Sequence, residues 1–170
     1  MSENQKRWIR FFVQIAAITA LICIDRFLKA LVDVRLKGQG TVVLIKGVLG
    51  LTYAENTGAA FSLFSNGTAA LTVITGIALF AGLLALALVK KKPLIYDICI
   101  PLIIAGGAGN QIDRLTRGYV IDYIRTLFID FPVFNFADCL ITCACFAVIV
   151  WLIVGIVRDS KKEKSGGSGA

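Results

Sequence analysis

Four long apolar segments constrain this chain more than any other feature of its sequence. They cover residues 8–31, 69–89, 96–112 and 138–157, and the second of them contains no charged residue. A helix needs about 20 apolar residues to cross the roughly 30 Å of hydrocarbon in a bilayer. We therefore predict a membrane protein of the all-α class, built as a bundle of four transmembrane helices.

The composition agrees with a lipid environment, because 57% of the residues are hydrophobic and only 17% are charged. Soluble domains carry about 25% charged residues. The first apolar segment lacks a small-residue cleavage site, so we interpret it as a span and not as a removable signal peptide. We expect residues 1–160 to form one integral membrane domain and residues 161–170, rich in Gly and Ser, to form a flexible tail.

Basic residues beside the spans indicate their orientation. They cluster before the first span, between the second and third, and after the fourth, and acidic residues are fewer there. The basic residues are Lys6, Arg7, Arg10, Lys90, Lys91, Lys92, Arg158, Lys161, Lys162 and Lys164, and the acidic ones are Glu3, Asp97, Asp159 and Glu163. Loops rich in Lys and Arg stay in the cytoplasm. We therefore expect both termini in the cytoplasm, the segments 32–68 and 113–137 outside, and no nucleic-acid partner despite the net charge of +7.

The outer segments are too apolar for ordinary loops. Residues 41–54 are rich in β-branched side chains, with breaks at Gly47 and Gly50, and predict a pair of strands in a small extracytoplasmic β-sheet. The apolar residues in 59–64 that follow predict an interfacial segment at the bilayer surface. Residues 128–136 have the same character.

The chain contains no histidine, which excludes Ser-His-Asp and Cys-His catalysis and HExxH zinc sites. Its five cysteines form no CxxC pair, so we expect small core residues and no metal. We expect no cofactor. Acid–base chemistry must then use Asp, Glu, Lys, Tyr or Cys.

Two aspartates near the predicted outer edge of the membrane attract most attention. Asp138 begins the fourth span, where an aspartate often only caps the helix, and Asp122 could be an ordinary carboxylate in a loop or at a strand end. As a pair they suggest more. Two carboxylates held close together share one proton, so one can activate water while the other supports a carbonyl oxygen. This chemistry hydrolyses peptides without metal, serine or histidine.

Other polar residues at this edge have structural explanations. Asp113 and Arg114 follow a glycine-rich helix end and predict an ion-pair hub, and Asp25 and Lys29 predict an (i, i+4) ion pair. Three glycines would permit close helix packing. These are Gly106, Gly107 and Gly109. Three asparagines are turn residues or ligands of backbone or substrate amides. These are Asn56, Asn110 and Asn135.

Five short motifs, taken together in this order and spacing, resemble the lipoprotein signal peptidase family, the bacterial signal peptidase II. The resemblance covers about residues 8–158. The motifs are Asp25-x-x-x-Lys29, Asn56-Thr-Gly58-Ala-Ala-Phe61-Ser62, Gly106-Gly-Ala-Gly109-Asn110-x-x-Asp113-Arg114, Val120-Ile-Asp122-Tyr123 and Phe134-Asn135-x-Ala137-Asp138. Two small departures are Gly109, which lies inside a Gly-Ala-Gly run, and Tyr123, where the family commonly has Phe.

The resemblance implies an intramembrane aspartic endopeptidase of the bacterial cytoplasmic (inner) membrane, with its active site at the outer face. Its substrates would be prolipoproteins, cut just before a cysteine that carries diacylglycerol, and membrane lipids would be further partners. Asp122 and Asp138 would form the catalytic dyad, and Asp25 and Lys29 would be structural. The residues that would support the dyad or contact substrate are Asn56, Gly58, Asn110, Asp113, Arg114, Asn135 and Ala137.

The spans alone leave two other functions open. A small four-span ion or proton transporter or channel subunit would place acids near the bilayer midplane. A structural membrane protein would use the polar cluster only to close the bundle.

Overall fold

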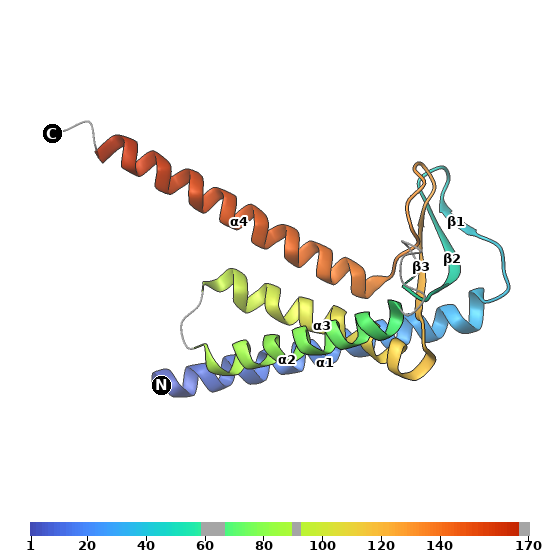
Figure 1. Ribbon diagram of the computed structural model, residues 1–170, viewed down its shortest axis with the longest axis horizontal. Helices are drawn as coiled ribbons and strands as arrows, with labels where there is room; N and C mark the ends of the chain where they lie inside the picture. The colour runs from blue at the N-terminus through green and yellow to red at the C-terminus, as the bar shows by residue number, and fades with distance from the viewer. Residues whose placement is uncertain (59–66, 90–92, 167–170) are drawn as a thin grey trace.

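The computed structural model describes residues 1–58, 67–89 and 93–166. Its elements follow the order α1 (Glu3–Leu36), β1 (Val42–Ile45), β2 (Leu49–Asn56), α2 (Gly67–Leu88), α3 (Leu94–Arg117), β3 (Val120–Thr126) and α4 (Phe136–Gly166) (Figure 1). All four helices are long and apolar enough to cross a membrane. The predicted four-helix membrane fold with a small sheet is confirmed, whereas the interfacial segment expected at 59–64 lies outside the described residues.

The helices extend beyond the predicted spans. Helix α1 begins early because Ser2 and Gln5 form a capping box at its N-terminus. Helix α3 continues to Arg117 and ends at Gly118, whose φ of 79° suits glycine. The prediction that Asp113 and Arg114 follow a helix end is therefore wrong, because both lie inside α3.

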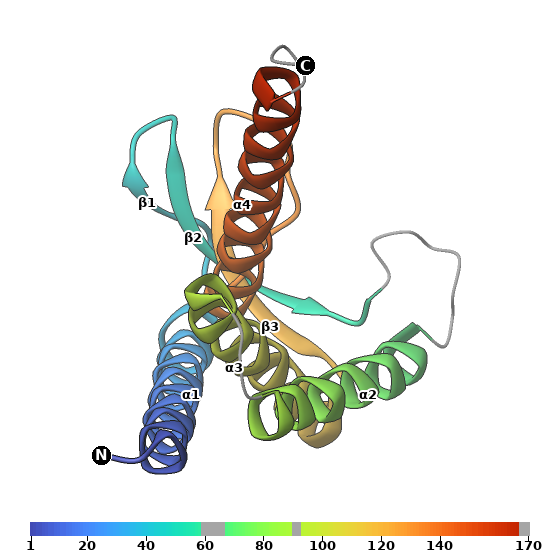
Figure 2. The ribbon, with the colours of Figure 1, turned by 90° about the vertical axis from the view of Figure 1, so that its left-hand side faces the viewer.

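Helix α3 lies at the centre and packs against the other three helices (Figure 2). The three glycines predicted for close packing each face a different neighbour. Gly106 lies against the backbone carbonyl of Ala137 in α4, and Gly107 faces a leucine of α2. At Gly109 a Cβ would come within 2.5 Å of Asp25 Oδ2 in α1. The glycines therefore allow α3 to approach all three helices closely.

The sheet is antiparallel, in the order β1-β2-β3. The predicted pair of strands is present as β1 and β2, but β3 was not expected. Asp122 lies within β3, opposite Ala54 of β2, and not in a loop or at a strand end. Period-2 alternation could not reveal β3, because four consecutive residues from Val120 to Tyr123 are all buried.

Figure 1 shows the sheet at the end of the helices that is remote from both termini. Val32 and Leu36 of α1 pack against Ile121 and Tyr123 of β3 in one hydrophobic cluster. This contact fixes β3 beside α1. It therefore holds Asp122 at the sheet end of the helix bundle.

Candidate active site

Asp122 is buried, and the amides of two asparagines hold its carboxyl group. Asn56 donates from Nδ2 to Oδ2 at 2.9 Å, and Asn135 donates from Nδ2 to Oδ1 at 2.6 Å. Burial raises the pKa of Asp122 to about 6, the hydrogen bond from Asn56 opposes the rise, and the charge of Asp138 adds to it. Asp122 therefore holds a proton more readily than an ordinary aspartate.

Asp138 lies in the first turn of α4, where it takes part in a reciprocal cap. The Asp138 N–H donates to Oδ1 of Asn135 at 3.0 Å, and the Asn135 N–H donates to Asp138 Oδ2 at 3.1 Å. The other carboxyl oxygen of Asp138 accepts from Nδ2 of Asn110 at 2.7 Å. Asp138 thus caps its helix and also faces the polar cluster.

Asparagines connect the two acids, which lie sixteen positions apart in the sequence. Asn135 donates to Asp122 and also to Oδ1 of Asn110 at 3.1 Å, and Asn110 in turn donates to Asp138. Asp122 and Asp138 therefore belong to one hydrogen-bonded network. Their charges also act on each other.

The turn after β2 orients Asn56. Gly58 has a φ of 81°, which favours glycine, and its N–H donates to Oδ1 of Asn56 at 2.8 Å. This Asx turn occupies the amide oxygen of Asn56, so its NH2 group faces Asp122.

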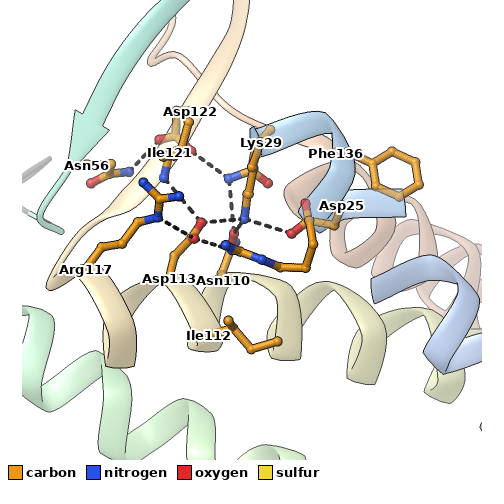
Figure 3. Close-up of polar contacts among 12 residues, drawn as sticks. Asp25, Lys29, Asn56, Asn110, Ile112, Asp113, Arg117, Ile121, Asp122 and Phe136 are labelled. Carbon is orange, nitrogen blue, oxygen red and sulfur yellow. Dashed lines mark hydrogen bonds and ion pairs between the residues drawn. The ribbon is translucent and has the colours of Figure 1, made fainter. Parts of the chain in front are cut away.

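Lys29 lies at the centre of a buried cluster beside this network (Figure 3). Its Nζ lies 3.0 Å from Oδ2 of Asp25, 3.0 Å from Oδ2 of Asp113 and 2.8 Å from Oδ1 of Asn110. The predicted ion pair between Asp25 and Lys29 is present, but it is part of this larger cluster.

Asp113 anchors β3 next to Asp122. It pairs with Arg26 and Lys29, and it accepts a hydrogen bond from the N–H of Ile121 at 3.4 Å. The predicted ion-pair hub is therefore present, but Asp113 pairs with Arg26 and Lys29 and not with the expected Arg114. Arg114 makes no ion pair with any described residue, although it is half-buried and interacts electrostatically with Asp138 and Asp122.

Two residues support the geometry by packing. Ala137 is fully buried between α3 and α4, where its neighbours are Gly106 and Gly109. Tyr123, which no motif singled out as a site residue, accepts a hydrogen bond on its hydroxyl from the N–H of Phe136 at 3.3 Å. Burial raises the pKa of Tyr123, which keeps this hydroxyl neutral. The departure from the Phe common in the family was the only sequence signal for it.

Two cavities lie near the acids. One of about 260 Å³ is bordered by Asp122, by residues 54–57 and by Pro132 and Val133. A second of about 330 Å³ is almost wholly apolar and lies among α2, α3 and Ile141 of α4. In the described part of the chain, no three His, Cys, Asp or Glu side chains form a group that could hold a metal ion.

The model of the family described as signal peptidase (SPase) II matches residues 17–154 of this sequence. The chain belongs to the signal peptidase II family. A lipoprotein signal peptidase of Lactiplantibacillus plantarum is 35% identical over 154 residues, which cover 90% of this chain and 99% of that protein. One of Enterococcus faecalis is 34% identical over 161 residues, which cover 94% and 98%.

Solved structures agree with this assignment. A bacterial membrane enzyme solved by the in meso method at 1.9 Å has a TM-score of 0.75 and 30% sequence identity, with 82% of this chain and 92% of that chain covered. Membership of the signal peptidase II family makes this chain a multi-pass membrane protease. It thereby favours an enzyme over the transporter, channel subunit or structural protein that the four spans left open.

Proposed function

We propose that this signal peptidase II is an aspartic endopeptidase that cuts diacylglyceryl-modified prolipoproteins just before the lipidated cysteine. The observation that carries the proposal is the asparagine network around two acids, Asp122 and Asp138, at the sheet end of the helices. Aspartates that act on each other share a proton, and this gives one acid and one base in the same site.

The surroundings of the two acids favour different roles. Asp122 is buried and keeps the shared proton. Asp138 is half-buried, and its negative charge is stabilised by the N-terminus of α4 and by donors from Asn110 and Asn135. Asp138 therefore acts as the base on a water molecule that it can reach, and Asp122 as the acid.

The chemistry then follows in two steps. Asp138 takes a proton from a water molecule while the oxygen of that water attacks the scissile carbonyl carbon. At the same time Asp122 gives its proton to the carbonyl oxygen. In the second step Asp138 passes its proton to the amide nitrogen and the C–N bond breaks. Asp122 recovers a proton from the tetrahedral hydroxyl as the new carboxyl group forms, so both acids return to their starting states.

The cavities suit a substrate with a lipid at the cut site. Gly107 lines the apolar cavity one helical turn before Asn110, and Ile141 lines it one turn after Asp138. The apolar cavity therefore begins about one turn deeper than the acids and can take an apolar part of the substrate. The cavity beside Asp122 borders β2, on the side where we expect the exported chain. We accordingly propose that the acids face the outside of the cytoplasmic membrane, with both termini in the cytoplasm.

The test is cleavage of a purified diacylglyceryl-modified prolipoprotein by the full chain in detergent. Asp122→Asn and Asp138→Asn should each lower the rate by about 10²- to 10⁴-fold, the range for loss of a general acid or base, while thermal melting shows that both variants are folded. Asp130→Asn, which changes an exposed acid in the loop after β3, is the matched control and should cleave normally. Cleavage at the normal rate by Asp122→Asn would refute the dyad.

A further inference from the structure

All three asparagines of the network turn an NH2 group toward a carboxylate. An asparagine amide can present either its oxygen or its NH2 group, and only the NH2 group attracts a carboxylate. In two of the three, a backbone N–H fixes the choice by occupying the oxygen: Gly58 does this for Asn56, and Asp138 does it for Asn135.

The third asparagine is oriented by a side chain of α1. Oδ1 of Asn110 accepts from Lys29 Nζ at 2.8 Å, and Nδ2 of the same amide donates to Asp138 at 2.7 Å. If Asn110 flipped, its NH2 group would face an ammonium and its oxygen a carboxylate, so both contacts would become repulsive. Lys29 is fully buried, so water does not compete for this contact.

We propose that Lys29 is a positioning residue, which sets the direction of the hydrogen bonds around the acidic pair by holding the amide oxygen of Asn110. This inference rests on the proposed function of the pair. The effect extends to both acids, because the same oxygen of Asn110 accepts from Nδ2 of Asn135, which donates onward to Asp122. One ammonium group on α1 thus orients the donor of α3, and it holds in place the oxygen to which Asn135 also donates.

Asp25 offers a matched control for a purely structural role. It contacts the same ammonium group at 3.0 Å, yet no hydrogen bond from the described residues connects it to any of the three asparagines. Asp25→Asn weakens the buried ion pair but leaves the contact between Lys29 and Asn110. Lys29→Met removes both the ion pair with Asp25 and the contact with Asn110. Lys29→Gln restores an N–H donor for Asn110 without the charge.

The experiment measures kcat and KM of each full-length variant on the lipid-modified prolipoprotein, together with thermal melting. We expect Lys29→Met to lower kcat by about 100-fold, the loss typical of a misplaced catalytic group, with little change in KM. Lys29→Gln should recover part of this loss. Asp25→Asn should melt at a lower temperature but keep the kcat of the folded enzyme.

A double-mutant cycle with Asn110→Ala tests whether Lys29 acts through Asn110. If it does, the double variant is no slower than the slower single variant, whereas independent roles multiply the two losses. The proposal is wrong if the losses multiply, if Lys29→Met and Asp25→Asn have equal kcat, or if both Lys29 variants fail to fold.

Asp122→Asn separates the proposal for Lys29 from the proposed function of the acidic pair. An active Asp122→Asn variant refutes the dyad itself, whereas an inactive one beside a fully active Lys29→Met refutes only the role of Lys29.

Discussion

Replacing Asn56 by leucine, which has a similar volume but no donor, should shift the pH range in which the enzyme works. The proposed mechanism needs a proton on Asp122, so activity falls as pH rises through the pKa of that group, which is about 6. The hydrogen bond from Asn56 stabilises the ionised carboxylate and so lowers this pKa. Its removal raises the pKa, and the alkaline limb of the pH–rate profile moves to higher pH.

The size of the shift follows from the geometry. A hydrogen bond to a charged group contributes about 1.5–3 kcal/mol, and one pKa unit corresponds to about 1.4 kcal/mol. The bond from Asn56 to Asp122 is 2.9 Å long, but Asn56 itself is exposed, so water replaces part of it. The lower end of the range applies, which predicts a shift of about one pH unit.

The assay is kcat/KM for the lipid-modified prolipoprotein between pH 4 and 9, because kcat/KM reports the pKa values of the free enzyme. Glu55→Gln is the control. Glu55 is the exposed neighbour of Asn56 and pairs with Lys37 at 3.1 Å. The alkaline limb of the pH–rate profile of Glu55→Gln should therefore stay in place. An alkaline limb that stays in place in Asn56→Leu, or that moves to lower pH, would show that Asp122 does not carry the proton.

Two substitutions, Gly109→Ala and Tyr123→Phe, test a packing contact and a hydrogen bond that hold the site in place. Gly109→Ala should lower the melting temperature, because the new Cβ would lie 2.5 Å from Asp25 Oδ2, and overpacking costs about 1–3 kcal/mol. Gly155→Ala, whose Cβ would meet nothing within 4 Å, should melt no lower than the natural chain, and equal melting of the two variants would contradict the packing argument. Tyr123→Phe should cost about 0.5–1.5 kcal/mol of stability measured by denaturation, because the N–H of Phe136 loses its partner. Cleavage should persist, and an unchanged stability would show that this bond contributes nothing.

The sequence predicted the elements with the strongest local patterns. Apolar length predicted all four helices, and β-branched residues with glycine breaks predicted the β1–β2 hairpin. Strand β3 was missed because its buried residues Val120 to Tyr123 do not alternate. Its place depends on Asp113 and on α1, which are contacts between segments far apart in the chain. No local pattern can report such contacts.

The same limit applies to the polar residues of the site. Their types and positions suggested an acidic pair and an ion pair, but they did not indicate which residues each side chain would contact. Asp113 sits next to Arg114 in the sequence, yet a helix turns adjacent side chains about 100° apart. Its cations therefore come from one turn of α1, as Arg26 and Lys29, and from Arg117 on its own helix.

Capping and catalysis were alternative interpretations of Asp138 in the sequence, but they do not exclude each other in the structure. The cap with Asn135 uses Oδ2 and fixes the carboxyl group to the start of α4, so Oδ1 points toward Asn110. A carboxylate held in this way needs no reorganisation to serve as a base. Asp138→Asn should therefore keep the cap, since an amide oxygen still accepts the hydrogen bond from the N–H of Asn135. Its NH2 group then takes the place of Oδ1, so the variant loses both the group that can take a proton from water and the acceptor for Nδ2 of Asn110.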